Sequence, residues 1–238
     1  MRWYYRSKIA AHLNSSKGEL SLRSVYFPAL KAVYLPNPKV AGSTIMTTLI
    51  SADGSPHLAG IRDHNEPESR RLMSAEYNPR AFWRALLDPG HFRFAFVRDP
   101  YGRAVSAFLD KIVSGREVRF RTMLGFEHDE QVSFLTFLNR ISEQEVSKMN
   151  RHWRPQSALI SPDVKLNFVG RFELFSDDFH RVLEQLGVEE TSVSAKRDHQ
   201  TSATDNLNLI GADEKALIDR LYGDDFERFS YAKRLPIQ

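Results

Sequence analysis

The chain has 238 residues, 42% of them hydrophobic and 26% charged, a composition typical of a globular protein with one sizeable α/β domain. Its 33 basic and 30 acidic residues leave a formal net charge of only +3, too small an excess to indicate a nucleic-acid partner. Cysteine is absent, which excludes disulfides, thiolate zinc sites and cysteine nucleophiles.

We expect neither a membrane-spanning segment nor a secretory signal in this sequence. No apolar run approaches the roughly 20 residues needed to cross a bilayer. The first residues, MRWYYRSKIAAHLNSSKGEL, include no continuous hydrophobic region. We therefore expect no transmembrane segment and a cytoplasmic location. Since no linker rich in Gly, Ser or Pro divides the chain, we expect an N-terminal extension over 1–30 and a single domain over 31–238.

Hydrophobic periodicity predicts strands that alternate with helices. In chain order we expect a strand at 31–35, a helix after Thr44, a loop over 55–70, a helix at 79–87, a strand at 92–97, a helix after Asp99, a helix around 134–138, a strand at 164–169, a helix at 179–186 capped by Ser176 or Asp177, and a last helix at 213–222. This alternation predicts an α/β fold with a central parallel sheet flanked by helices. Ligands bind at the carboxyl ends of such strands, where Lys39 and Arg98 fall.

The first segment of chemical interest is PKVAGST, residues 38–44, between the first predicted strand and its helix. Small residues at a helix start let main-chain N–H groups approach an anion, and Lys39 can neutralise its charge. The segment is not a Walker A motif, because the lysine of that motif follows its second glycine, whereas Lys39 precedes Gly42. Taken alone, it fits an anion site and equally a helix start beside a solvated lysine.

The second segment is FAFVRDPYGRAVSAFLDK, residues 94–111. Asp99 and Pro100 fit the N-cap and first position of a helix, so Asp99 needs no role as the magnesium ligand of a Walker B strand. Arg98 is suited to bind a phosphate through two hydrogen bonds, and Ser106 can add a neutral one. The alternatives are a salt bridge for Arg98 and an exposed helix position for Ser106.

Together, P-K-V-A-G-S-T and V-R-D-P-Y-x-R-x-V-S-A-F resemble the sulfotransferase superfamily. In that family the first segment binds the 5′-phosphosulfate and the second the 3′-phosphate of 3′-phosphoadenosine 5′-phosphosulfate (PAPS). The stretches HWRPQ (152–156), FVGRFELF (168–175) and LIDRLYGDDFERFSYAK resemble the carbohydrate sulfotransferase branch, which includes chondroitin 4-O- and HNK-1-type enzymes. The similarity extends from about residue 31 to residue 233.

The resemblance implies a P-loop-like three-layer fold and a PAPS-dependent carbohydrate O-sulfotransferase that needs no metal. The donor contacts that it implies are Lys39, Val40, Ala41, Gly42, Ser43, Thr44, Arg98 and Ser106. Arg197 is a further candidate, because residues 196–206 lie where related enzymes add late contacts to the donor. Animal members carry a membrane anchor and cysteines; neither is seen here, which favours an anchor-free enzyme of bacterial type.

Sulfuryl transfer needs a base for the acceptor hydroxyl, and it needs cations and N–H donors for the charge on the leaving nucleotide. Lys39 fits the second task. For the base we favour His64, in the polar segment after the first predicted helix, where Asp63 or Glu66 could orient its ring. The alternative bases are His57, His152 or a carboxylate.

Two functions of other classes fit parts of the sequence. One is an ATP-dependent P-loop kinase, which the missing Walker A lysine disfavours. The other is a non-catalytic nucleotide- or glycan-binding relative, which the intact Lys39, Arg98 and Ser106 disfavour.

The acceptor is less well specified by the sequence. We expect its contacts in the variable segments 53–78 and 113–131. The basic residues Arg116, Arg119 and Arg121 fit an acidic acceptor, and they fit a solvated basic face as well.

Overall fold

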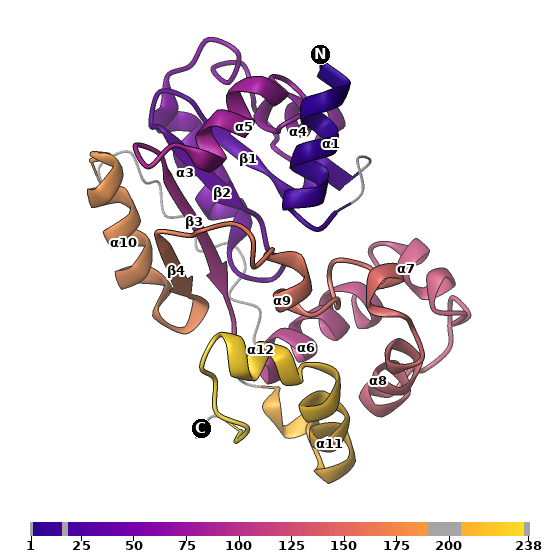
Figure 1. Ribbon diagram of the computed structural model, residues 1–238. Coiled ribbons are helices and arrows are strands. Elements are labelled where there is room, and N and C mark those ends of the chain that lie inside the picture. The colour runs from indigo at the N-terminus through magenta and orange to yellow at the C-terminus, as the bar shows by residue number, and fades with distance from the viewer. Residues whose placement is uncertain (1, 16–18, 190–205, 236–238) are drawn as a thin grey trace. The chain divides into compact units, whose positions relative to one another are not determined.

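A computed structural model describes residues 2–15, 19–189 and 206–235. The chain forms two compact units, each with its own hydrophobic core (Figure 1). Of the described residues, those within 2–97 and 159–189 form the sheet unit, and those within 98–158 and 206–235 form the helical unit. The single domain that was expected to begin at residue 31 stays a prediction.

The sheet unit is built on four strands in the order β1-β2-β3-β4. β2, β3 and β4 run parallel, and β1 joins β2 as an antiparallel edge strand that the sequence analysis did not predict. The elements of this unit are α1 (Arg2–His12), α2 (Leu20–Arg23), β1 (Val25–Phe27), β2 (Ala32–Leu35), α3 (Gly42–Asp53), α4 (Pro67–Met73), α5 (Pro79–Leu87), β3 (Phe92–Val97), β4 (Phe168–Arg171), a 3-10 turn (Phe172–Leu174) and α10 (Phe175–Leu186).

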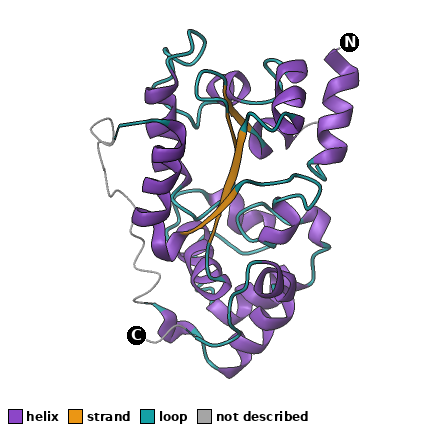
Figure 2. Ribbon diagram, turned by 60° about the vertical axis from the view of Figure 1, so that its left-hand side comes forward, coloured by secondary structure: helices purple, strands orange, loops and turns teal. Residues whose placement is uncertain are grey.

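Helices cover both faces of this sheet (Figures 1 and 2). Side chains alternate along a strand, which sends Tyr34, Phe94 and Phe96 to one face. That face packs against apolar side chains of α3 and α10: Ile45, Leu49, Phe179, Val182 and Leu183. On the other side α5 contacts β2, and α1 packs against α5. The predicted α/β class with a central, mostly parallel sheet flanked by helices is therefore confirmed.

The glycine of the FVGR strand makes room for a core ring. Gly170 lies opposite Phe96 in the β3–β4 ladder, and a Cβ on Gly170 would come within 2.4 Å of Cε1 of Phe96. The ring has no free space to retreat into, because Phe96 is fully buried against Phe175 and Phe179. A side chain at position 170 would thus displace the core of this unit.

The helical unit packs around Trp153, whose side chain is fully buried. Its ring meets those of Phe120 and Phe137, each at a centroid distance of 6.0 Å, and its Nε1 donates to Oε1 of Gln144 at 3.1 Å. Trp153 is therefore a packing residue. The elements are α6 (Pro100–Phe108), a π-helical turn (Leu109–Val113), α7 (Val118–Met123), α8 (Phe134–Ser142), a 3-10 turn (Val146–Lys148), most of α9 (Gln156–Leu159), a 3-10 turn (Leu207–Leu209), α11 (Ala212–Leu221) and α12 (Gly223–Arg228).

Most predicted elements are confirmed. The strands predicted at 31–35 and 92–97 correspond to β2 and β3, and the helix predicted at 79–87 has the bounds of α5. Asp99 caps α6 as predicted, with its Oδ1 accepting the N–H of Gly102 at 3.0 Å. Gly187 ends α10 in the left-handed conformation that favours glycine.

Three predicted boundaries were wrong. The polar segment 55–70 ends earlier, because α4 begins at Pro67. The strand predicted at 164–169 instead spans 168–171. The N–H of Arg93 donates to the side-chain oxygen of Asn167 at 2.9 Å, so regular strand pairing begins only after Asn167. Neither Ser176 nor Asp177 caps α10, which begins at Phe175; inside its first turn, Asp178 accepts the N–H of Arg171 at 2.8 Å.

Candidate functional site

The loop between β2 and α3 is anchored by a residue that the sequence analysis passed over. β2 ends at Leu35, as the two prolines predicted, and Asn37 between them is buried. Its Nδ2 donates to the main-chain oxygen of Phe96 at 3.1 Å, which ties the loop to β3. The loop therefore starts from a fixed point at the carboxyl ends of two parallel strands.

The same loop holds two residues in an uncommon conformation. Lys39 has a φ of 73° and Ala41 a φ of 58°, although neither is glycine, and Val40 between them has no positive φ. Each left-handed non-glycine residue costs roughly 1–2 kcal/mol. Such strain concentrates at functional sites, and alternating hands turn successive N–H groups toward one concave side that suits an anion.

The start of α3 lacks an acceptor of its own. Ala41 is the N-cap and offers no side-chain oxygen, and the first turn contains no acidic residue. The first N–H groups of a helix have no partner within the helix and carry a partial positive charge. With Lys39 half-buried beside them, the amides of Gly42, Ser43 and Thr44 form a donor set for a phosphate or sulfate.

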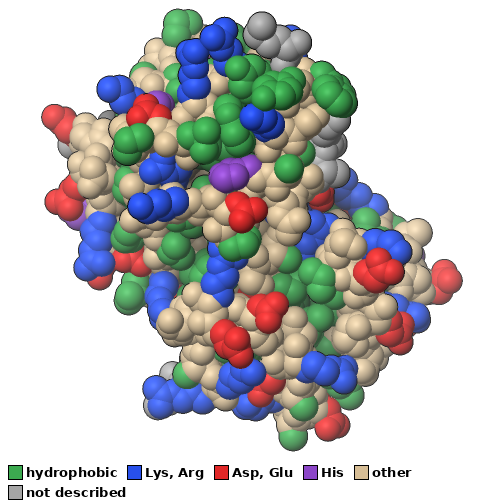
Figure 3. All heavy atoms as spheres, viewed as in Figure 1, with side chains coloured by type: hydrophobic (Ala, Val, Ile, Leu, Met, Phe, Trp, Pro, Cys, Tyr) green, Lys and Arg blue, Asp and Glu red, His purple; other side chains and the backbone are tan. Residues whose placement is uncertain are grey.

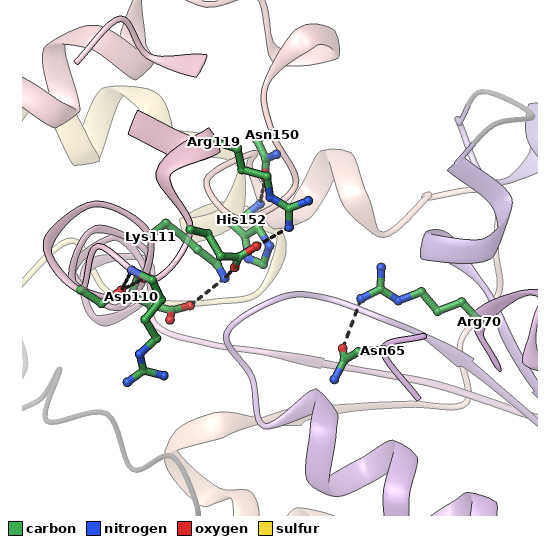
Figure 4. A network of polar contacts seen from close by, with 10 residues as sticks. Asn65, Arg70, Asp110, Lys111, Arg119, Asn150 and His152 are labelled. Atoms are coloured by element: carbon green, nitrogen blue, oxygen red, sulfur yellow. Dashed lines mark hydrogen bonds and ion pairs between the residues drawn. The ribbon is translucent and has the colours of Figure 1, made fainter. Parts of the chain in front are cut away.

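His64 has the properties of a neutral base. Its Nε2 is buried and has no hydrogen-bond partner among the described residues. Burial lowers the pKa of His64; the charge of Asp63 opposes this shift, and the charge of Arg70 adds to it. Figure 4 shows Arg70 turned to Asn65, whose Oδ1 accepts from Nη2 of Arg70 at 3.2 Å. Burial therefore favours the neutral form of the imidazole, the form in which one ring nitrogen can accept a proton.

His57 lies near the amino end of β2, at the opposite end of that strand from the Lys39 loop. α3 runs back from the carboxyl end of β2, and Asp53 at its far end accepts the N–H groups of Ala29 and Leu30 in the turn before β2, at 3.0 and 3.1 Å. His57 follows directly, stacks on Tyr77 at 4.5 Å, and its pKa is lowered by burial while the charge of Asp53 opposes the shift. This placement, away from the Lys39 loop, argues against His57 as the base.

The segment that carries His64 returns toward the edge where β2 ends. Just after α4, the N–H of Ala75 donates to Oγ of Ser24 at 3.2 Å. Ser24 precedes Val25, which pairs with Tyr34 near the carboxyl end of β2. Along the chain, His64 thus lies between His57, which is near the amino end of β2, and α4, which ends near the carboxyl end of β2 where the Lys39 loop begins.

In the helical unit, Arg98 lies just before α6, and Ser106 lies within it. Their side chains are 3% and 0% exposed, so the exposed position considered for Ser106 is wrong. Ser106 follows Gly102 by four residues within α6, the spacing of one helix face. A Cβ on Gly102 would lie 3.5 Å from Nε and 3.8 Å from Nη2 of Arg98, so the guanidinium lies over the first turn. The Arg98 guanidinium over Gly102 and the Ser106 hydroxyl one turn later thus form a strip with two side-chain donors of the kind that bind phosphate.

His152 belongs to a different environment in the helical unit. Its ring meets Phe120 edge-on at 5.4 Å. Figure 4 shows it beside the ion pairs of Lys111, which contacts Asp110 at 3.2 Å and Glu117 at 2.7 Å. These charges lie on a π-helical turn and the segment after it, a type of irregularity that is frequent near functional sites.

Of the three basic residues considered for an acidic acceptor, one has a structural role. Arg121 is buried and donates to the main-chain oxygens of Ile112, Glu127 and Glu130. Arg119 remains 71% exposed and pairs with Glu117. On the face shown in Figure 3, basic and acidic side chains are interspersed. A uniform basic face is therefore not seen there.

Two further predictions concern metals and Arg197. Among the described residues, no group of three or more His, Asp or Glu side chains is placed to bind a metal ion. Arg197 lies outside the described residues, so its predicted donor contact stays a prediction.

A profile of the Sulfotransferase family matches residues 23–232. The chain belongs to this family. Carbohydrate sulfotransferase 14 of Danio rerio is 28% identical to this sulfotransferase over 169 residues, which cover 65% of the chain and 46% of the relative. The Mus musculus protein of the same name is 30% identical over 164 residues, covering 64% and 43%. Carbohydrate sulfotransferase 11 of Mus musculus is 24% identical over 166 residues, covering 60% and 47%.

The matched regions span less than half the length of these relatives. No solved structure matches the chain. The predicted membership of the sulfotransferase superfamily is confirmed, and the named relatives are those of its carbohydrate branch.

Proposed function

We propose that this sulfotransferase moves a sulfuryl group from PAPS to a hydroxyl of a carbohydrate acceptor. The observation that carries the proposal is the strained loop before α3, which holds Lys39 and leads into helix-start amides without a side-chain cap, in a member of this family. The buried Arg98–Ser106 strip supports it, because a donor with a second phosphate needs a second set of donors.

Two groups of residues would hold the donor. The 5′-phosphosulfate would lie against the start of α3, where Lys39 and the amides of 42–44 neutralise the charge that develops on the leaving phosphate. The 3′-phosphate would be held by Arg98 through two hydrogen bonds and by the hydroxyl of Ser106. Because all these donors come from the protein, we expect binding without a metal ion.

His64 would act as the base. When bound, PAPS supplies the sulfuryl group, and its bridging S–O bond breaks as the acceptor oxygen bonds to sulfur. Nε2 of His64 would accept the proton of the acceptor hydroxyl, which suits an imidazole whose pKa is lowered by burial. The group that leaves is 3′,5′-ADP, and Lys39 would stabilise its new charge.

A carbohydrate acceptor is favoured by the relatives, whose names describe carbohydrate sulfotransferases. Arg116 and Arg119, both exposed, stay candidates for an acidic group of the acceptor. Arg121 is not a candidate, because three main-chain oxygens already occupy its guanidinium.

The structure also bears on whether the chain contains a helix that could span a membrane. Within the part of the chain that the structure describes, no helix has both the length and the apolar character needed to cross a bilayer. The cytoplasmic location and the anchor-free bacterial type stay predictions, which cell fractionation in the source organism tests.

Calorimetric titration in EDTA tests the proposal against its rivals. We expect 3′,5′-ADP to bind, and ATP to bind much more weakly because it lacks the 3′-phosphate. Equal affinities would remove the assignment of Arg98, and a magnesium requirement would favour the kinase. Tight binding of 3′,5′-ADP by an enzyme that transfers no sulfate would favour the non-catalytic relative.

A further inference from the structure

The main chain of Arg98 is held by one buried side chain. β3 pairs with β4 up to Val97, so Arg98 lies just beyond the ladder. The N–H of Arg98 donates to Oε1 of Gln156 at 2.9 Å, and Nε2 of Gln156 donates to the oxygen of Arg98 at 2.8 Å. A single amide thus makes both hydrogen bonds that a neighbouring strand would make. Gln156 itself is fully buried.

Gln156 is in turn fixed from behind by Asp225. The carboxylate of Asp225 is fully buried and accepts the N–H of Gln156 at 2.8 Å and that of Ser157 at 2.7 Å. The cations Arg103 and Arg228 interact with this carboxylate, and Arg228 also donates to the oxygen of Ser157 at 2.8 Å. The position of the Gln156 amide is therefore set by a compensated, buried network.

We propose that Gln156 is a positioning residue that aims Arg98 at the 3′-phosphate of the donor. The inference rests on the proposed function. Gln156 fixes the main chain of Arg98. The guanidinium of Arg98 extends from this point over the first turn of α6, on the strip that ends at Ser106. A rotation of residue 98 would move the guanidinium out of the planar geometry that two hydrogen bonds to one phosphate require.

The chemistry of the contact requires glutamine. Its amide is at once an acceptor and a donor, as the N–H and the oxygen of Arg98 demand. Ionised glutamate keeps the shape and the acceptor but cannot donate to the Arg98 oxygen. Asparagine is shorter by one methylene. The substitution Gln156→Glu therefore removes one of the two bonds with little change of volume.

The competing explanation is a purely structural one, since any buried main-chain group needs a partner. A structural role predicts equal damage to every ligand, whereas positioning of Arg98 affects the 3′-phosphate alone. The pair 3′,5′-ADP and 5′-AMP isolates that group, because the two nucleotides differ only by it. Gln144→Glu is the matched control: Gln144 lies in the same unit, and its oxygen, which glutamate retains, accepts from Trp153.

The test is calorimetric titration of both nucleotides with folded variants. We expect Gln156→Glu to weaken 3′,5′-ADP about tenfold and to change 5′-AMP less than twofold, while Gln144→Glu changes neither. In an Arg98→Ala background, Gln156→Glu should cause no further loss. Equal losses for both nucleotides, or an added loss in the Arg98→Ala background, would overturn the proposal. If Arg98→Ala itself leaves 3′,5′-ADP binding unchanged, the 3′-phosphate assignment fails, and the inference fails with it.

A second measurement needs no folded Gln156 variant. In the NMR spectrum of the wild-type protein, the side-chain amide signals of Gln156 should shift when 3′,5′-ADP is added and stay in place when 5′-AMP is added. The same signals should not respond to 3′,5′-ADP in Arg98→Ala. Signals that respond equally to the two nucleotides in the wild-type protein would contradict the coupling.

Discussion

The assignment of His64 as the base predicts a pH dependence that two neighbouring charges tune in opposite directions. A base must be neutral to accept a proton, so the rate is full above the pKa of His64 and falls as the pH drops through it. Burial lowers that pKa below its ordinary value, and the charge of Asp63 raises it while that of Arg70 lowers it. The acidic limb should therefore lie below pH 6.5, the ordinary pKa of histidine.

The charge variants follow from these signs. Arg70→Gln removes a cation that disfavours the imidazolium, so the pKa of His64 rises and the acidic limb moves to higher pH. Asp63→Asn removes an anion that favours the imidazolium, so the limb moves to lower pH. Arg84→Gln, on the exposed side of α5, is the control and should leave the limb in place. Initial rates of sulfate transfer from saturating PAPS over pH 5 to 8, buffered at constant ionic strength, measure these shifts.

Removal of the imidazole measures how much His64 contributes to the transfer rate. His64→Ala should lower the transfer rate by roughly 10²–10⁴, the usual range for a general base. It should keep 3′,5′-ADP affinity within about threefold, because no donor phosphate is assigned to His64. Near-normal turnover by His64→Ala, or limbs of Arg70→Gln and Asp63→Asn that move in the same direction, would refute the reasoning. An inactive His152→Ala beside an active His64→Ala would move the role to His152.

Three further predictions concern nucleotide binding and folding. Arg98→Ala should lose about 1.5–3 kcal/mol of 3′,5′-ADP binding, as expected for a charge-assisted contact, and Ser106→Ala about 1 kcal/mol, both measured by calorimetry; unchanged affinity in folded Arg98→Ala would contradict the assignment. Lys39→Ala should weaken PAPS more than it weakens adenosine, since only PAPS carries the 5′ charge; equal effects in a competition assay would argue against a lysine–phosphosulfate contact. Gly170→Ala should lower the free energy of unfolding in urea by about 1–3 kcal/mol through its clash with Phe96, whereas Gly60→Ala, with nothing within 4 Å, should change it little; equal stabilities would show that the Phe96 ring can move aside.

The regular elements were predictable because each has a local cause. FRFAFV is apolar except for Arg93, whose buried side chain donates to main-chain oxygens, and Asp99 with Pro100 marks a helix start through bonds within one turn. The Lys39 loop and Arg98 were recognised because small residues, a lysine and an arginine follow two strands. The main-chain geometry of the Lys39 loop was not predicted, because nothing in the residue types requires Lys39 and Ala41 to adopt left-handed conformations.

The residues that fix the site were missed for a physical reason. Asn37, Gln156 and Asp225 act through main-chain groups that are distant along the sequence: Gln156 bonds to Arg98, and Asp225 bonds to Gln156. No periodicity or spacing signals such a contact. β1 was overlooked for a similar reason, because three residues are too few to show a period and their pairing with β2 decides their conformation.

The most direct test of the central claim is sulfate transfer itself. Incubation with radiolabelled PAPS, EDTA and a panel of glycans should label a glycan and release 3′,5′-ADP in equal amount, and Lys39→Ala should abolish both. PAPS that binds but labels no glycan on the panel, or a phosphate moved from ATP to the same acceptors, would contradict the account.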